Sequence, residues 1–138
     1  MPSGRSLCLD VGERRIGIAV SDDGGWLASP LQVLERREAA RDFQRLADVV
    51  HEQHATQVVV GLPRTLDGGI GPQARRVQRW TARLAPNLQV PIVYWDERYS
   101  TAEAYRRLAA TGRSRRARAP IDAVAAAVIL QDYLDSER

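Results

Sequence analysis

The chain has 138 residues, 44% of them hydrophobic and 27% charged, proportions that are ordinary for a globular protein, and this length predicts one domain over residues 1–138. A single cysteine, Cys8, excludes an internal disulfide and a cysteine-based metal cluster. The longest apolar run, "AVAAAVIL", is far shorter than the roughly 20 residues of a membrane span. No signal peptide is recognisable, and we therefore expect a cytoplasmic protein with no membrane partner.

All 20 basic residues are arginine and 17 residues are acidic, which gives a net charge of +3. Genome base composition explains the lack of lysine most simply, but the arginines are also segregated. Residues 68–95 and 104–121 contain no acid. These two segments hold Arg75, Arg76, Arg79 and Arg83, and Arg106, Arg107, Arg113, Arg115, Arg116 and Arg118. Solvated surface faces usually interleave acids with bases, so this pattern favours a polyanion partner, and we expect nucleic acid.

The first elements are predicted to form a β-hairpin. Two apolar runs, Leu7–Val11 and Ile16–Val20, flank a short charged turn at Gly12–Arg15. Residues 26–36 then predict a third strand, although Pro30 interrupts it.

A helix is predicted next, over residues 38–54, from apolar residues at helical spacing. The β-branched run at 57–62 is typical of a strand buried on both faces of a parallel sheet. After a loop rich in turn-forming residues, a second helix is predicted at about 73–85. One face of this helix carries Arg75, Arg79 and Arg83.

The last third of the chain predicts one more strand and two helices. Residues 90–97 form the strand, and a capping box at Ser100 begins a helix that Gly112 ends. Residues 113–120 have no apolar anchor and are predicted to be a loop, and the alanine-rich segment 121–138 a helix. The order βββαβαβαα predicts an α/β fold with a mixed five-stranded sheet flanked by helices.

Three acids interrupt apolar or small-residue surroundings. Asp10 lies within the first strand, Glu97 ends the last strand, and Asp122 opens the final helix. If the first and last strands are neighbours, these carboxylates can meet at the carboxyl edge of the sheet. Each has a simpler explanation alone: Asp10 can point to solvent, Asp122 can stabilise a helix N-terminus, and Glu97 can pair with Arg98. The pleat leaves Asp96 as the alternative to Glu97.

Three carboxylates at one place repel one another, and a divalent cation removes the conflict. Oxygen-only ligands suit Mg²⁺ or Mn²⁺, and a pair of such ions could bracket a scissile phosphate. The sequence therefore predicts a metal-dependent phosphodiesterase site.

Four motifs in order resemble those of the YqgF/RuvX family: "LDVGERRIGIAVSD", "VVVGLP" followed by "DGG", "DERYSTAEA" and "IDAVAAAVILQDYL". The resemblance runs from about Leu7 to Leu134. Members of this family are small bacterial proteins with a ribonuclease H-like fold, described as pre-16S rRNA nucleases and as Holliday junction resolvases. The resemblance implies that Asp10, Glu97 and Asp122 are the acids of a ribonuclease H-like site. It also implies nearby roles for Arg15, Arg98 and Ser100.

Two departures from the family pattern are visible. Residues 64–66 read Arg-Thr-Leu where members often carry an asparagine, and Pro120 and Ile121 precede the last acid where a lysine is common. If that lysine assists catalysis, Arg118 must replace it, and the two side chains are not equivalent.

The function expected from these observations is a metal-dependent endonuclease that processes the 5′ end of pre-16S rRNA, with structured RNA or branched DNA as partner. There are two alternatives, a Holliday junction resolvase and a nucleic-acid-binding factor without catalysis. A resolvase needs two active sites and therefore a homodimer rather than a monomer. The first motif also resembles that of actin-like ATPases, but 138 residues give room for only one of their two lobes. The residues expected to bind nucleic acid are Arg15, Arg75, Arg79, Arg98, Arg113, Arg115, Arg116 and Arg118.

Overall fold

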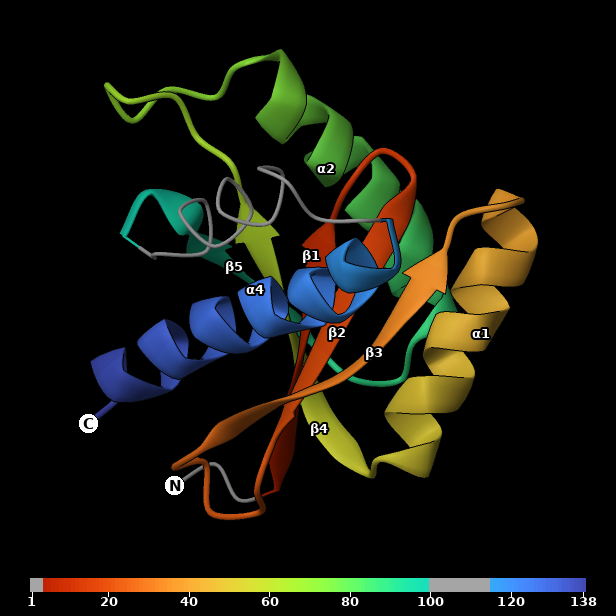
Figure 1. Ribbon diagram of the computed structural model, residues 1–138, viewed down its shortest axis with the longest axis vertical. Helices are drawn as coiled ribbons and strands as arrows, with labels where there is room; N and C mark the ends of the chain where they lie inside the picture. The colour runs from red at the N-terminus through yellow and green to blue at the C-terminus, as the bar shows by residue number, and fades with distance from the viewer. Residues whose placement is uncertain (1–3, 100–114) are drawn as a thin grey trace.

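The computed structural model describes residues 4–99 and 115–138 (Figure 1). Its centre is a five-stranded sheet in the order β3-β2-β1-β4-β5. The strands are β1 (Arg5–Val11), β2 (Arg15–Ser21), β3 (Ala28–Glu35), β4 (Ala55–Leu62) and β5 (Ile92–Asp96). β1, β2 and β3 pair antiparallel, whereas β4 pairs parallel with both β1 and β5. The predicted mixed five-stranded sheet is confirmed, but β5 is shorter than expected, and Glu97 lies beyond its end.

The helices are α1 (Ala39–Glu52), α2 (Pro72–Leu84) and α4 (Arg115–Ser136), with short 3₁₀ turns η1 (Ala85–Asn87) and η2 (Glu97–Tyr99). The predictions for α1 and α2 are confirmed to within a few residues. The helix expected over 100–112 lies outside the described residues. The prediction of a loop at 113–120 is wrong from Arg115 onward, because α4 begins at that residue. Arginine and alanine make up residues 115–119 and are both strong helix formers, and a helix does not need an apolar anchor in its first turns.

The irregular pairing of β3 explains how a strand tolerates Pro30. β3 is an edge strand, and the register of its pairing with β2 shifts between Ile18 and Ala19, where Ala19 stands opposite Pro30. Proline lacks an N–H to donate, so it is tolerated at edges and bulges.

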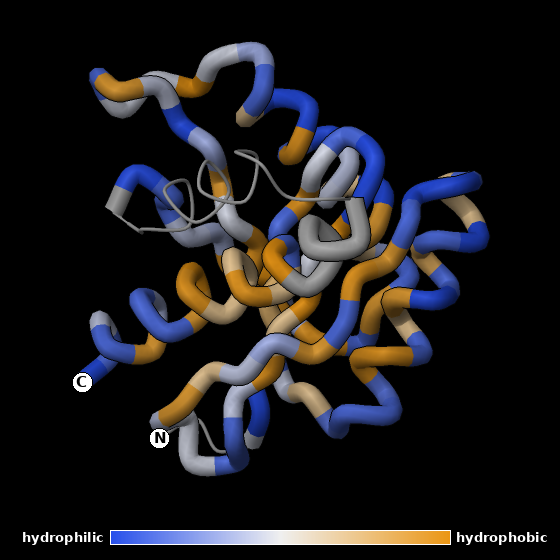
Figure 2. Tube along the Cα trace, in the orientation of Figure 1, coloured by the Kyte–Doolittle hydropathy of each residue, from blue (hydrophilic) through white to orange (hydrophobic). Residues whose placement is uncertain are grey.

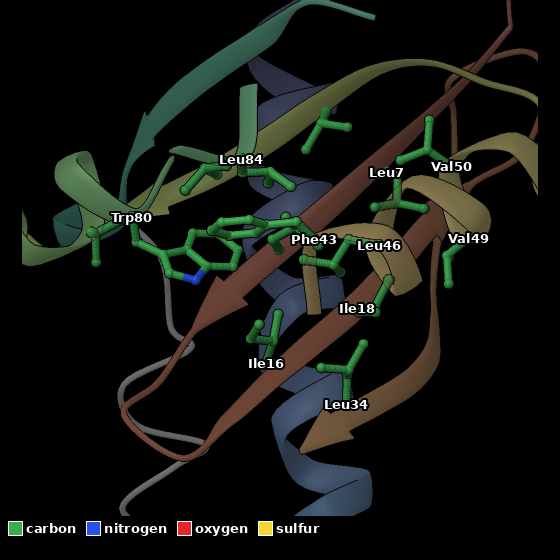
Figure 3. Close-up of a cluster of buried hydrophobic side chains, with 14 of the residues drawn as sticks. Leu7, Ile16, Ile18, Leu34, Phe43, Leu46, Val49, Val50, Trp80 and Leu84 are labelled. Atoms are coloured by element: carbon green, nitrogen blue, oxygen red, sulfur yellow. The ribbon is translucent and has the colours of Figure 1, made fainter. Parts of the chain in front are cut away.

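α1 and α2 cover one face of the sheet with the larger hydrophobic core (Figure 3). The strands contribute Leu7, Leu9, Ile16, Ile18, Val58 and Val60, and the helices Phe43, Leu46, Trp80 and Leu84. The rings of Phe43 and Trp80 meet at 5.6 Å between centroids, which joins α1 to α2. Hydrophobic segments accordingly concentrate in the central strands, and hydrophilic ones on the outer parts of the helices (Figure 2).

α4 covers the other face with a second core, which includes Cys8 and Val59 of the sheet and Ala125 and Ala126 of the helix. These small residues let the helix approach closely. Because side chains alternate along a strand, Asp10 faces the same side as Cys8, toward α4. Within residues 4–99 and 115–138, no helix has the length and apolar character that a membrane crossing requires.

Candidate functional site

The surroundings of Asp10 are set by two glycines in the neighbouring strands. Gly17 of β2 pairs directly with Asp10. On the other side Leu9 pairs with Val60 of β4, so the next residues along the two strands, Asp10 and Gly61, also lie side by side. Asp10 is only 9% exposed. Glycine inside a strand commonly marks the close approach of another group, and both glycines here do so. Neither glycine is among the site residues predicted from the sequence, although a glycine within an apolar strand is itself a signal of such an approach.

Glu97 occupies the space above Gly61. A Cβ added to Gly61 would lie 2.8 Å from Glu97 Oε1 and 3.0 Å from its Cγ. Burial raises the pKa of the Cys8 thiol well above its ordinary value, and the negative charges of Asp10 and Glu97 raise it further. Both carboxylates therefore act on the face that α4 covers, close to Cys8.

The expected route by which Glu97 reaches Asp10 is corrected by the strand order. β1 and β5 are not neighbours, because β4 separates them. Glu97 reaches across β4 only because Gly61 has no side chain there.

Asp122 approaches from α4 on the opposite side of Asp10. Its carbonyl oxygen would lie 2.0 Å from a Cβ on Gly17, so the helix backbone rests directly on β2. Its carboxylate, however, accepts a hydrogen bond from Arg15 Nε at 2.7 Å, in a half-buried ion pair. Among the described residues, no three His, Cys, Asp or Glu side chains are grouped closely enough to hold a metal ion. The three acids thus share one face and one end of the sheet, with the Asp122 carboxylate engaged by Arg15.

Asp96 lies on the other side of the sheet from Glu97. It pairs with Leu62, which belongs to the core under α1 and α2. Its carboxylate accepts hydrogen bonds from Arg98 Nε and Nη2, the latter at 2.7 Å, and lies 3.6 Å from Arg64 Nη1. Burial alone raises the pKa of Asp96, but the hydrogen bonds of Arg98 and the charges of Arg98 and Arg64 outweigh it, and the pKa is lowered. Asp96 is therefore built into a structural ion-pair cluster.

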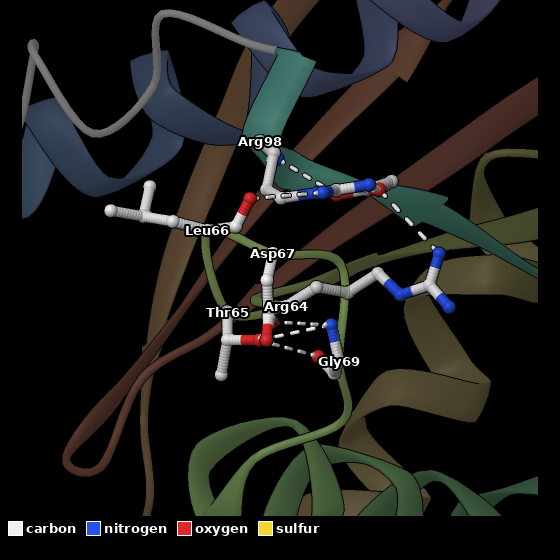
Figure 4. Close-up of polar contacts among 7 residues, drawn as sticks. Arg64, Thr65, Leu66, Asp67, Gly69 and Arg98 are labelled. Atoms are coloured by element: carbon white, nitrogen blue, oxygen red, sulfur yellow. Dashed lines mark hydrogen bonds and ion pairs between the residues drawn. The ribbon is translucent and has the colours of Figure 1, made fainter.

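Arg98 also ties the loop after β4 to this cluster, as Figure 4 shows. Its Nη1 donates to the Leu66 carbonyl at 3.3 Å. Within the loop the Thr65 hydroxyl donates to the Asp67 carboxylate, and both side-chain oxygens accept the Gly69 N–H. The hydrogen bonds from Thr65 and Gly69 lower the pKa of Asp67. The "DGG" turn signal therefore marks an ordered loop, which Arg98 positions.

The arginines predicted to bind nucleic acid are spread over several surroundings. Arg15 pairs with Asp122 and Arg98 with Asp96. Arg79 lines a groove between α2 and the β1–β2 turn, whereas Arg75, exposed on the same helix, does not line it. Arg115, Arg116 and Arg118 fall in the first turns of α4, and Arg113 lies outside the described residues.

The donor chemistry of the site fits a hard divalent cation. Asp10 and Glu97 offer only carboxylate oxygens, the ligands that Mg²⁺ and Mn²⁺ favour, and two adjacent carboxylates with one nearly buried favour a compensating cation. One oxygen of Asp122, Oδ2, is engaged by Arg15. Asp10 and Glu97 therefore form the core of the candidate site, with Asp122 and Arg15 as a paired unit at its rim.

Comparisons with known proteins agree with the motifs. A family model described as "RuvX: Holliday junction resolvase" matches residues 4–136. A protein of Roseiflexus is 46% identical over 98% of this chain and 96% of its own length, and one of Desulforudis audaxviator is 42% identical over 97% and 96%. Both carry the name "putative pre-16S rRNA nuclease".

The fold has a counterpart among solved structures. Thermus thermophilus RuvC, in a complex with a Holliday junction substrate, superimposes with a TM-score of 0.58 at 16% identity, covering 97% of this chain and 95% of RuvC. This similarity establishes the ribonuclease H-like architecture of the sheet and its helices. The resemblance found in the sequence motifs is confirmed, and the chain belongs to the RuvX family.

Proposed function

We propose that this chain is a metal-dependent endonuclease that hydrolyses phosphodiester bonds and processes the 5′ end of pre-16S rRNA during ribosome biogenesis. The observation that carries the proposal is the placement of the Glu97 carboxylate over Gly61, beside the nearly buried Asp10. The names of the full-length relatives support the substrate class. The proposal treats residues 1–138 as one nuclease domain that acts in the cytoplasm, where ribosomal RNA precursors are processed.

Asp10 and Glu97, together with Asp122, are the proposed metal ligands and catalytic residues. Mg²⁺ or Mn²⁺ held by these carboxylates would activate water and offset the charge that develops on the scissile phosphate. The Arg15 guanidinium, now paired with Asp122, is the cation best placed to take a phosphate oxygen in exchange for that carboxylate. Such an exchange would couple arrival of the substrate to release of the third acid.

Nucleic acid is the proposed partner, held through its backbone by Arg15, Arg79 and the arginines at 113–118. Arg98 acts in this proposal as a positioning residue, because Asp96 and the Leu66 carbonyl occupy its guanidinium. The role of Arg75 stays a prediction.

The test compares Asp10→Asn with the wild type on an rRNA-leader hairpin and on a four-way DNA junction. Loss of the Asp10 charge should lower metal-dependent cleavage by about 100-fold or more, and EDTA should abolish it, while binding measured by fluorescence anisotropy persists. Asp23→Asn is the matched control, since Asp23 lies at the other end of the hairpin and its side chain is 84% exposed. Wild-type cleavage of both substrates by Asp10→Asn would refute the proposal.

A Holliday junction resolvase is the second candidate, and the description of the matching family favours it. Symmetric cleavage of a junction requires two active sites, and this candidate therefore predicts a homodimer in sedimentation experiments, whereas rRNA processing is compatible with a monomer. Binding of both nucleic acids without any metal-dependent cleavage would instead indicate a factor without catalysis.

A further inference from the structure

A groove of about 640 Å³ lies between α2 and the turn that joins β1 to β2, two segments that stand together in Figure 1. Gly12 and Glu13 line it from the turn. Arg36, which follows β3, and Arg76, Arg79 and Arg83 of α2 supply its charge. Among the described residues that line the groove there are thus four arginines and one acid, so the groove is strongly positive.

Two of these arginines are held against aromatic rings. The Arg36 guanidinium lies 5.7 Å from the centre of the Trp80 ring and donates to the Gly12 carbonyl at 2.8 Å. The Arg83 guanidinium lies 5.6 Å from the centre of the Phe43 ring. Such contacts fix a cation without neutralising it, so less conformational freedom is lost when an anion binds.

The other two arginines are exposed. In the part of the chain that the structure describes, neither Arg76 nor Arg79 has a carboxylate within 4.0 Å. A phosphate therefore does not have to displace an internal partner from them, which sets them apart from Arg15 and Arg98.

The groove begins where the candidate site ends. Val11, one residue after Asp10, lines it, and successive strand residues face opposite sides of the sheet. The groove therefore lies on the α1 and α2 side of the same sheet edge that presents Asp10 to α4. A polymer that leaves the site across the β1–β2 turn would enter the groove directly.

We propose that this groove binds the phosphate backbone of a single-stranded segment of nucleic acid that continues from the cleavage site. The inference rests on the proposed nuclease function for the identity of the polymer. A double helix is too stiff to turn from one side of a sheet to the other across one short turn (for DNA the persistence length is about 150 base pairs), whereas a single strand can do so. Four arginines in one groove suit contacts with the phosphate backbone, which do not depend on base sequence.

The test measures binding of two fluorescein-labelled RNAs by anisotropy in the cleavage-deficient Asp10→Asn background. One RNA is a hairpin, and the other is the same hairpin with a single-stranded extension of about ten nucleotides, placed at the 5′ or the 3′ end. The variants are Arg76→Ala with Arg79→Ala, and the matched control is Arg41→Ala, an exposed arginine of α1 that does not line the groove.

The double variant should weaken binding of the extended RNA by about tenfold and reduce its salt slope by about 0.7 for each lost contact, and it should weaken binding of the bare hairpin by a clearly smaller factor. Equal losses with Arg41→Ala, or equal losses on both RNAs, would overturn the groove proposal. If polyglutamate displaced the extended RNA as effectively as unlabelled RNA does, the groove would be a general site for acidic polymers. That result would overturn the groove proposal as well. A groove effect without any cleavage by the wild type would refute the nuclease proposal alone, because the binding readout does not depend on catalysis.

Discussion

Replacing Gly61 with alanine tests whether the position of Glu97 matters for cleavage. The added Cβ would lie 2.8 Å from Glu97 Oε1, about 0.6 Å short of the 3.4 Å at which ordinary contact begins. The clash is with the end of a flexible side chain, so the carboxylate must move by at least that amount while the backbone can stay. Displacements of 0.5–1 Å at a catalytic group cost roughly 10- to 100-fold in rate, and we expect a loss in that range.

The stability of Gly61→Ala should change little. Gly61 does not have a positive φ, so alanine fits its backbone, and the lower entropy of the unfolded chain contributes about 0.4–1 kcal/mol in favour of folding. This gain offsets the cost of moving Glu97, and we expect a free energy of unfolding within about 1 kcal/mol of the wild type.

The assay pairs metal-dependent cleavage with urea unfolding. Gly24→Ala is the control, because its Cβ would meet Trp26 Cδ1 at 2.9 Å, a similar overlap at the opposite end of the hairpin. Cleavage at the wild-type rate by Gly61→Ala would refute the reasoning, and so would an equal loss in Gly24→Ala.

Three further changes test the supports of the site. Gly17→Ala places a Cβ 2.0 Å from the Asp122 carbonyl oxygen, a backbone atom that moves only with α4. This overlap should lower the free energy of unfolding by roughly 3 kcal/mol or more. A change below about 1 kcal/mol in urea unfolding would contradict this expectation. The lowered pKa of Asp96 means that its charge stabilises the fold above about pH 4 and that this contribution is lost as the pH falls through the lower folded-state pKa. The difference in unfolding free energy between the wild type and Asp96→Asn should therefore shrink from pH 7 to pH 3, and a constant difference would disprove the coupling. Arg98→Ala removes the donor to the Leu66 carbonyl and should speed amide hydrogen exchange in the loop after β4, whereas unchanged exchange would mean that the loop's own hydrogen bonds suffice.

The sequence by itself determined the family and most of the local elements that the structure describes. The charged turn between two apolar runs specified the β1–β2 hairpin, and the spacing of apolar residues specified α1 and α2. Hydrophobic periodicity and turn chemistry act over a few residues, so they are legible without a structure. The three acids were also recognisable as exceptions to their surroundings, which directed attention to one end of the sheet.

Only the tertiary structure decided how those acids are placed relative to one another. Insertion of β4 between β1 and β5 is a pairing of segments far apart in the chain, and no local pattern encodes it. That insertion makes Gly61 the position Glu97 must cross, and it turns Asp96 to the opposite side with Arg98 and Arg64. The ion pair between Arg15 and Asp122 spans 107 positions and likewise depends on α4 docking against Gly17. The candidate site residues were chosen from local signals in the sequence, whereas the partners of these residues follow from long-range pairing and packing.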